Sequence, residues 1–258
     1  MKFVLTIAGS DPTGGAGIQA DLKTISTLNC YSLSAITAIT SQTTNGMKEF
    51  VPVDPQALMS QILHLYREFN ISAVKLGIIA LAENVKNVTK LLIQKKQKNI
   101  VLDPIIFTGT GLRILDDKGI DAIKKRLIPE STVVTPNLLE ASILANMDIN
   151  GIDGMEKAAK KIANMGVKAV LVKGGHLAGD PVDVLYNRGK ITLLPDKRIP
   201  KDIHGAGCAL SSAIASFLAQ GKSIDTAVKM AKEFTSSCIT AGFRVSRKGK
   251  FLLKHFRD

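Results

Sequence analysis

The five residues His204-Gly205-Ala206-Gly207-Cys208 place a loop of small residues directly before a predicted helix. Backbone N–H groups and the helix dipole both attract negative charge at a helix start, so Gly205, Ala206 and Gly207 are predicted to form an anion-binding site. A thiol at the same place is expected to have a lowered pKa. Cys208 is therefore either a reactive group beside an anion hole or a small hydrophobic residue that fills a turn.

Four further candidate residues follow three other predicted strands. Asp103 could hold Mg²⁺, which prefers one or two carboxylates with phosphate oxygens, or form the turn before the next proline. Asn137 and Glu140, three residues apart at a helix start, could face one site or simply form a capping box. Lys173 precedes two glycines and offers a charge for a phosphate or a strand-end contact. Together these residues indicate Mg²⁺-assisted phosphoryl transfer.

A glycine-rich loop, AGSDPTGGAG, occupies residues 8–17. Its glycines allow the backbone to turn tightly and to approach a ligand closely. The spacing matches neither a Walker A loop nor the dinucleotide-binding fingerprint. The loop is either part of a ligand site or a tight turn before a helix.

Short apolar segments alternate with amphipathic ones, which is typical of an α/β fold with a mainly parallel sheet and helices on both faces. The predicted buried strands are residues 2–7, 73–78, 99–102, 132–135 and 169–172. The predicted helices are residues 16–28, 55–69, 83–96, 117–127, 138–145, 154–165, 206–219 and 223–240. A hairpin is predicted from residues 182–186 and 191–194, with a turn at Arg188-Gly189. No linker or repeat interrupts the pattern, so residues 1–258 are predicted to form a single domain.

Composition excludes several classes of function. No segment has the length of a membrane span or the pattern of a signal peptide, and three scattered cysteines indicate cytosolic thiols, so a cytoplasmic protein without membrane contact is expected. The net charge of +12 suits anionic ligands. The chain has no Trp and only 5% aromatic residues, so nucleic-acid binding is poorly supported, even by the basic C-terminal tail at residues 244–258.

The motifs in these loops resemble those of one enzyme family. In chain order they are AGSDPTGGAGIQADLKT, TSQTTNG, KLGII, VLDPI, TPNLLEA, VLVKGGH and HGAGC. Their order and spacing are similar to those of the hydroxymethylpyrimidine/phosphomethylpyrimidine kinases of thiamine biosynthesis. The resemblance extends over about residues 1–242. It implies the three-layer sandwich of the ribokinase-like superfamily, close to the pyridoxal kinases.

This resemblance implies ATP-dependent phosphorylation of the hydroxymethyl group of 4-amino-5-hydroxymethyl-2-methylpyrimidine. A second phosphorylation would convert the monophosphate to the diphosphate. The pyrimidine would be held by Gln42 at the ring edge, by Gly9 and Asp21 in the same pocket, and by Ile78 and Ile105 as apolar walls.

The resemblance also implies roles around the phosphates. Asp103 and Glu140 would organise Mg²⁺, Asn137 and Lys173 would address the ATP phosphates, and residues 205–208 would form the anion hole. Cys208 stands where sugar kinases of the superfamily carry an aspartate base. It would either accept the hydroxyl proton or only contact the substrate while positioning and electrostatics suffice. Because relatives are commonly dimers, a homodimer is expected.

Several positions depart from the family pattern. Ala206 and Ala209 stand where threonines are usual, Ile203 replaces the usual threonine before the histidine, and Ile78 replaces a common methionine. The tail at residues 244–258 is basic where the family has a Gly- and His-containing segment. Two alternatives therefore remain open. One is a pyridoxal or pyridoxine kinase, whose substrate also bears a hydroxymethyl group, and the other is a non-catalytic pyrimidine-binding relative.

Overall fold

The computed structural model of the chain describes residues 1–108, 111–177, 179–245 and 249–256. Within them, the strands of the central sheet are β1 (Lys2–Ser10), β2 (Cys30–Thr43), β3 (Gly46–Pro52), β4 (Ile71–Leu76), β5 (Ile100–Leu102), β6 (Val133–Val134), β7 (Ala169–Val172), β8 (Val182–Asn187) and β9 (Lys190–Pro195). Their spatial order is β3-β2-β1-β4-β5-β6-β7-β8-β9. The six strands from β2 to β7 in this order are parallel, whereas β3 at one edge and β8 and β9 at the other pair antiparallel.

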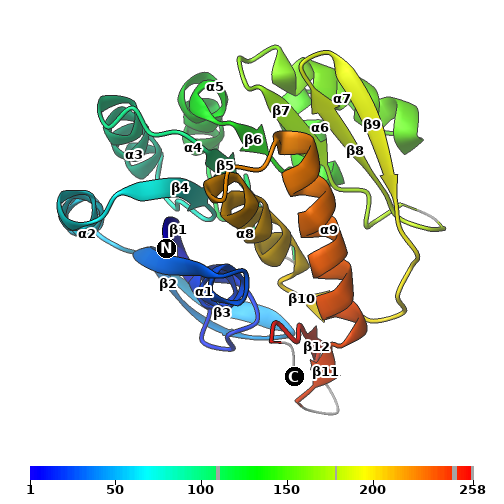
Figure 1. Ribbon diagram of the computed structural model, residues 1–258, viewed down its shortest axis with the longest axis horizontal. Coiled ribbons are helices and arrows are strands. Elements are labelled where there is room, and N and C mark those ends of the chain that lie inside the picture. Colours follow the sequence, from blue (N-terminus) through cyan, green and yellow to red (C-terminus); the bar gives the residue numbers. More distant parts are fainter. Residues whose placement is uncertain (109–110, 178, 246–248, 257–258) are drawn as a thin grey trace.

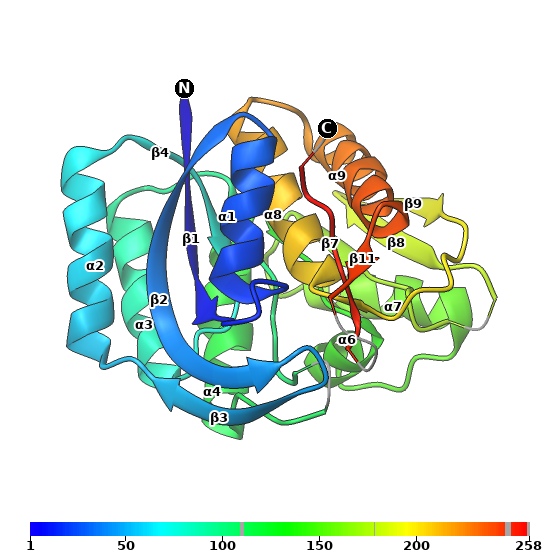
Figure 2. The same ribbon diagram turned by 90° about the horizontal axis from the view of Figure 1, so that it is seen from below.

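Helices cover both faces of this sheet (Figure 1, Figure 2). One face carries α1 (Gly17–Thr27), α8 (Ala206–Ala219) and α9 (Ile224–Thr240). The other carries α2 (Pro55–Glu68), α3 (Ala82–Gln94), α4 (Asp117–Ala122), the π-helical turn η1 (Ile123–Leu127), α5 (Ile128–Glu130), α6 (Leu138–Ala145) and α7 (Gly151–Ala163). The α/β fold with a mainly parallel sheet and two helical layers is confirmed.

The alternation of side chains along the strands explains the two cores. In β1, Val4 packs among residues of α8 and α9, whereas Leu5 and Ile7 pack among residues of α2, α3 and α7. Successive side chains of a strand point to opposite faces, so a continuous apolar strand serves both layers. Helix starts follow local chemistry as well. Asp54 caps α2 by accepting hydrogen bonds from two backbone N–H groups, and Ser223 caps α9.

The five predicted buried strands and the 182–194 hairpin are confirmed, with shifts of one to three residues at several ends. The predicted helix at residues 117–127 is instead divided into α4 and η1. Two long strands were missed, β2 and β3. The sequence of β2, CYSLSAITAITSQT, is rich in small polar residues, and it contains no continuous apolar run.

A second, small sheet was also missed. It joins β10 (Ile203–His204), β12 (Phe251–Leu252) and β11 (Phe243–Arg244) in the order β10-β12-β11. Part of the predicted basic tail therefore pairs with the strand that leads into α8, while residues 246–248 and 257–258 of that tail lie outside the described residues. In the described part of the chain, no helix combines the length and apolar character that a membrane span requires.

Candidate active site

The loops at the carboxyl ends of the parallel strands surround one cavity of about 460 Å³. A cavity of this size can enclose a small-molecule ligand. Every predicted site residue except Asp21 lines it: Gly9, Gln42, Ile78, Asp103, Ile105, Asn137, Glu140, Lys173, Gly205, Ala206, Gly207 and Cys208. These residues come from strand ends, helix starts and loops between Gly9 and Cys208, and the parallel sheet brings them to one edge.

One wall of the cavity combines an apolar surface with a few polar groups. Ile78 and Ile105 line it together with Met47, while Gln42 lies on β2 beside them. A Cβ atom added to Gly9 would lie 3.7 Å from the side chain of Ile78, so Gly9 keeps the backbone of β1 close to this wall. Met47 was not predicted, because it lies on the unrecognised strand β3.

A largely buried ion pair forms another part of the cavity lining. The ammonium of Lys173, at the end of β7, lies 2.8 Å from Oδ1 of Asp103, at the end of β5. Burial alone would lower the pKa of Lys173, but the charges of Asp103 and Glu140 outweigh it and the pKa is raised. A Cβ atom on Gly207 would lie 3.2 Å from this ammonium, so the ion pair abuts the first turn of α8.

Asn137 and Glu140 form the capping box that opens α6. The backbone N–H of Asn137 donates to Oε2 of Glu140 at 2.8 Å, and the backbone N–H of Glu140 donates to Oδ1 of Asn137 at 2.9 Å. Glu140 is only 2% exposed, and this burial raises its pKa to about 7, with Lys173 opposing and Asp103 adding to the shift. The local interpretation is confirmed, and both residues also face the cavity.

Two unpredicted residues join the glycine-rich loop to the loop before α8. The carboxylate of Asp11 accepts hydrogen bonds from the backbone N–H groups of Thr13 and Ala16, each at 2.8 Å, and lies 2.8 Å from Nε2 of His204. Burial would raise the pKa of Asp11, but the hydrogen bonds from His204 and from the loop outweigh it and hold the pKa well below its usual range. The Asp-Pro-Thr sequence signals the turn, whereas the pairing with His204 depends on tertiary contact alone.

Gly205 allows these two loops to touch. Its φ of 90° lies in the left-handed region, and a Cβ atom there would be 1.8 Å from the backbone oxygen of Gly15. The first backbone hydrogen bond of α8 runs from the N–H of Ala209 to the oxygen of Gly205, at 3.1 Å. The N–H groups of Ala206, Gly207 and Cys208 therefore have no partner within the helix, and these are the groups that an anion would meet.

The pKa of the Cys208 thiol differs from the expected one. Burial raises the pKa of its thiol to about 11, although the positive charge of Lys75 opposes the shift, and the carboxylates of Asp21 and Asp103 raise it further. The predicted lowering of the pKa is therefore wrong for the ligand-free protein. The side chain is only 8% exposed, and removal from water outweighs the favourable charge of Lys75.

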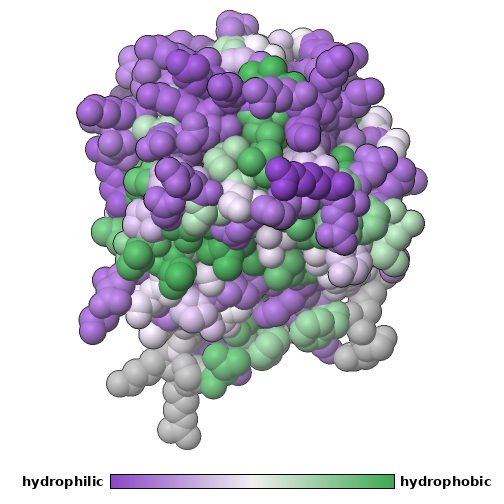
Figure 3. Space-filling model, turned by 90° about the vertical axis from the view of Figure 1, so that its left-hand side faces the viewer, coloured by the Kyte–Doolittle hydropathy of each residue, from purple (hydrophilic) through white to green (hydrophobic). Residues whose placement is uncertain are grey.

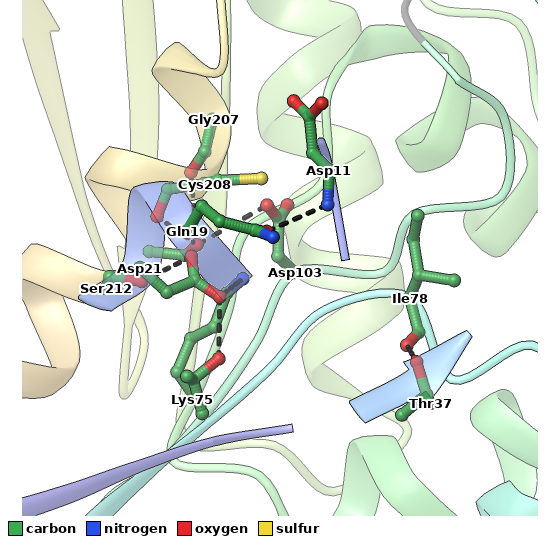
Figure 4. A network of polar contacts seen from close by, with 12 residues as sticks. Asp11, Gln19, Asp21, Thr37, Lys75, Ile78, Asp103, Gly207, Cys208 and Ser212 are labelled. Atoms are coloured by element: carbon green, nitrogen blue, oxygen red, sulfur yellow. Dashed lines mark hydrogen bonds and ion pairs between the residues drawn. The ribbon is translucent and has the colours of Figure 1, made fainter. Parts of the chain in front are cut away.

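Asp21 lies beneath the cavity rather than in its lining. Its carboxylate accepts hydrogen bonds from Thr6 at 2.6 Å, from the ammonium of Lys75 at 2.7 Å and from Ser212 at 2.8 Å. Figure 4 shows this chain of contacts on α1, β4 and α8, with Cys208 close by on α8. The predicted contact of Asp21 with the pyrimidine is thus corrected, because a fully buried carboxylate in α1 packs against the floor of the site.

Comparison with known proteins identifies the chain's relatives. The family model described as phosphomethylpyrimidine kinase matches residues 11–252. The chain belongs to this family. A hydroxymethylpyrimidine/phosphomethylpyrimidine kinase of Streptomyces coelicolor is 38% identical to it over 93% of this chain and 90% of its own length. A bifunctional thiamine biosynthesis protein of Geobacter sulfurreducens is 37% identical over 95% of this chain, which spans 49% of that longer protein.

Solved structures of related kinases share the fold of this member of the phosphomethylpyrimidine kinase family. The pyridoxal kinase of Staphylococcus aureus, in complex with AMP-PCP and pyridoxal, superimposes with a TM-score of 0.90 at 33% identity. The match covers 99% of this chain and 93% of that one.

Proposed function

We propose that this protein transfers the γ-phosphoryl group of ATP to the hydroxymethyl group of 4-amino-5-hydroxymethyl-2-methylpyrimidine, and then to the resulting monophosphate. One observation carries the proposal. A single cavity joins an apolar wall with a polar edge, at Ile78, Ile105 and Gln42, to the first turn of α8, whose N–H groups have no partner within the helix. The first part suits a small heteroaromatic ring, and the second suits a phosphoryl group.

The residues around Asp103 fit a magnesium ion. Asp103 and Glu140 supply two carboxylates at one edge of the cavity, and Mg²⁺ is usually bound by one or two carboxylates together with substrate phosphates. Burial raises the pKa of Glu140, and the nearby negative charge of Asp103 adds to this shift, so a cation between the two carboxylates would be favoured. When bound, the ion would neutralise charge on the ATP phosphates. Asn137 and Lys173 would hold those phosphates beside it.

Phosphoryl transfer would depend on the positions and charges of the groups around the phosphate, and not on a thiolate base. The N–H groups at the start of α8 would face the negative charge of the transferring phosphoryl group, and the ammonium of Lys173 lies close to Gly207 in that turn. With a pKa of about 11, Cys208 is a neutral thiol at neutral pH and lines the hole. In a loose transition state the hydroxyl proton leaves late, so no strong base is required.

The proposal is tested by ADP release with Mg²⁺-ATP and each of three acceptors: the pyrimidine alcohol, its monophosphate and pyridoxal. We expect the highest kcat/KM with the pyrimidine alcohol, and turnover of its monophosphate. In the same assay, Cys208→Ala is expected to lower kcat about tenfold or less. A loss beyond about a thousandfold with unchanged nucleotide affinity would restore Cys208 as the base. Pyrimidine binding without ADP release would support a non-catalytic relative instead.

Pyridoxal is the second candidate substrate. The S. aureus kinase that shares this fold is described in complex with pyridoxal. A pyridine ring with a hydroxymethyl group presents the same reacting atom to α8, and it differs at the ring edge that Gln42 meets. Gln42→Ala is therefore expected to lower kcat/KM for the pyrimidine more than for pyridoxal. A higher kcat/KM for pyridoxal in the wild-type protein would make this second function the principal one.

A cytoplasmic homodimer completes the proposal. Ile39 on β2 and Val51 on β3 lie directly opposite each other in the antiparallel register and are 59% and 58% exposed. Figure 3 views the molecule from the side of α2 and β2 and shows hydrophobic side chains gathered in a band there. Light scattering is expected to give twice the monomer mass, and Ile39→Lys is expected to shift it toward the monomer. A monomeric wild-type protein would contradict the assignment.

A further inference from the structure

Lys75 is a fully buried lysine that the phosphoryl-transfer scheme above does not use. It lies on β4, and both its side chain and that of its partner Asp21 are 0% exposed. A buried charged pair costs desolvation free energy that its mutual attraction scarcely recovers. An aliphatic residue would satisfy the packing of β4 equally well, so the charge requires another reason.

The ammonium of Lys75 lies at the floor of the active-site cavity. A Cβ atom on Gly77 would be 2.9 Å from Nζ of Lys75, so the missing side chain of Gly77 leaves the space that the ammonium occupies. Lys75 borders the same cavity as Asp103 and Cys208. Among the described residues, the structure records one hydrogen bond from this ammonium, to Asp21, whereas the group carries three donors.

Two consecutive serines connect α8 to both buried ion pairs. Ser212 donates to Oδ1 of Asp21 at 2.8 Å, and Ser211 lies 3.4 Å from Oδ2 of Asp103. Ser212 lies four residues after Cys208, so the two side chains share one side of the helix. The start of α8 is therefore tied to the sheet through carboxylates that two lysines hold in place.

We propose that Lys75 is a positioning residue for phosphoryl transfer, which fixes the start of α8 through Asp21 and Ser212 and places a positive charge behind the anion hole. This inference rests on the proposed function. The charged and titratable groups around the ammonium are Asp21 on α1, Asp103 after β5 and Cys208 on α8. Of these, the carboxylate of Asp21 is the direct partner, at 2.7 Å.

Three variants test the proposal in the full-length protein. Lys75→Met removes the charge and keeps the length of the side chain. Lys75→Met combined with Asp21→Asn removes both charges, so that no unpaired ion stays buried if the single variant fails to fold. Ser212→Ala breaks only the connection to α8. The matched control is Lys125→Met, which removes a lysine from an exposed ion pair on the far side of the sheet.

In the double variant we expect kcat to fall on the order of tenfold to a hundredfold, with the KM of the pyrimidine and the Kd of the nucleotide each within about threefold. Ser212→Ala is expected to lower kcat as well, by about fivefold. In the single Lys75→Met variant, alkylation of Cys208, followed by mass spectrometry of its peptide, is expected to slow about tenfold at fixed pH, because the positive charge that favours its thiolate is lost while Asp21 keeps its opposing charge.

Two results would overturn the inference: a folded double variant with kcat within about threefold of the wild type, or unchanged alkylation of Cys208 in a folded Lys75→Met variant. A purely structural role would lower the melting temperature and leave both readouts in place. Failure of the proposed function is recognised separately, because the wild-type protein would then release no ADP with any acceptor. The alkylation measurement still tests Lys75 in that case.

Discussion

Two buried ion pairs of the same composition serve different parts of this molecule. Asp103 and Lys173 come from the ends of β5 and β7, and the lysine side chain is 16% exposed. Asp21 and Lys75 lie on α1 and β4, and neither side chain is exposed at all. Each aspartate lies near one of the two consecutive serines of α8, yet only the first pair presents charge to an entering ligand.

The difference shows that the position of a residue along a parallel strand decides whether its side chain faces a ligand in the cavity or packs beneath a covering helix. The residue after a strand end faces the ligand, whereas a residue two positions earlier lies under the helix that covers the sheet. Asp103 follows the last residue of β5, and Lys75 precedes the last residue of β4 by one. Removing charge from the outer pair, Asp103 and Lys173, should therefore act mainly on turnover, whereas breaking the inner pair, Asp21 and Lys75, should lower stability as well as turnover.

The largest expected effect belongs to the outer pair. Asp103→Asn leaves Lys173 without its partner and removes a carboxylate from the proposed magnesium site, so kcat/KM should fall about a thousandfold. ADP release at saturating Mg²⁺ measures it. Asp121→Asn, an exposed aspartate on α4, serves as the control and should stay within about twofold. Equal turnover of the Asp103 variant and the wild type would remove Asp103 from the site.

Breaking the inner pair, Asp21 and Lys75, should lower the stability of the folded protein. Asp21→Asn strands the buried ammonium of Lys75, which should lower the free energy of unfolding by about 3–5 kcal/mol. Urea unfolding followed by circular dichroism measures this loss. Adding Lys75→Met should recover a large part of it, since the pair is then removed as a whole. A loss below about 1 kcal/mol would mean that the inner pair contributes no more than a surface pair.

The next largest effect is expected at the loop before α8, the helix whose two serines lie near the aspartates of both ion pairs. Gly205→Ala places a Cβ atom 1.8 Å from the backbone oxygen of Gly15 and forces φ of 90° on an alanine, so both stability and turnover should fall. The expected loss of stability is about 2–3 kcal/mol in thermal unfolding. Gly175→Ala, where an added Cβ atom meets nothing within 4 Å, should change stability by less than about 0.5 kcal/mol. Similar losses in both variants would contradict the close approach.

The pKa of Cys208 depends on charges from both ion pairs, through Lys75, Asp21 and Asp103. Because its pKa is raised to about 11, the thiol stays protonated near neutral pH, and the thiolate fraction grows as the pH rises toward that value. Alkylation of Cys208 should therefore accelerate about tenfold per pH unit between about pH 7 and pH 10. Over the same range kcat should change little. A plateau of alkylation below about pH 9 would show that the field of α8 outweighs burial.

The smallest effect is expected at the surface. Lys125 and Asp121 form an exposed pair on adjacent turns, with side chains 73% and 56% exposed. Replacing Lys125 by Ala should change the free energy of unfolding by no more than about 0.5 kcal/mol, because solvent screens such pairs. Urea unfolding in low and high salt measures this. A loss comparable to that of Asp21→Asn would show that burial does not distinguish the pairs.

Much of the fold follows from local patterns. The apolar segments before Asp103 and Lys173 indicated strands, and the Asn137 to Glu140 spacing allowed the capping box that the structure shows. The long strand β2 was missed because its buried face uses small residues such as Ala35 and Ala38 instead of a continuous apolar run. Its partner β3 was missed with it, and so was the contribution of Met47 to the cavity.

The sequence by itself determined most of the residues that line the cavity, because residue type, glycine spacing and strand ends are local properties. It also predicted an anion site at the start of α8, where the first N–H groups have no partner within the helix. Only the tertiary structure decided that Asp21 lies below the cavity, that Asp11 pairs with His204, and that burial raises the pKa of Cys208. Burial and charge pairing arise between segments far apart in the chain, so no local pattern records them.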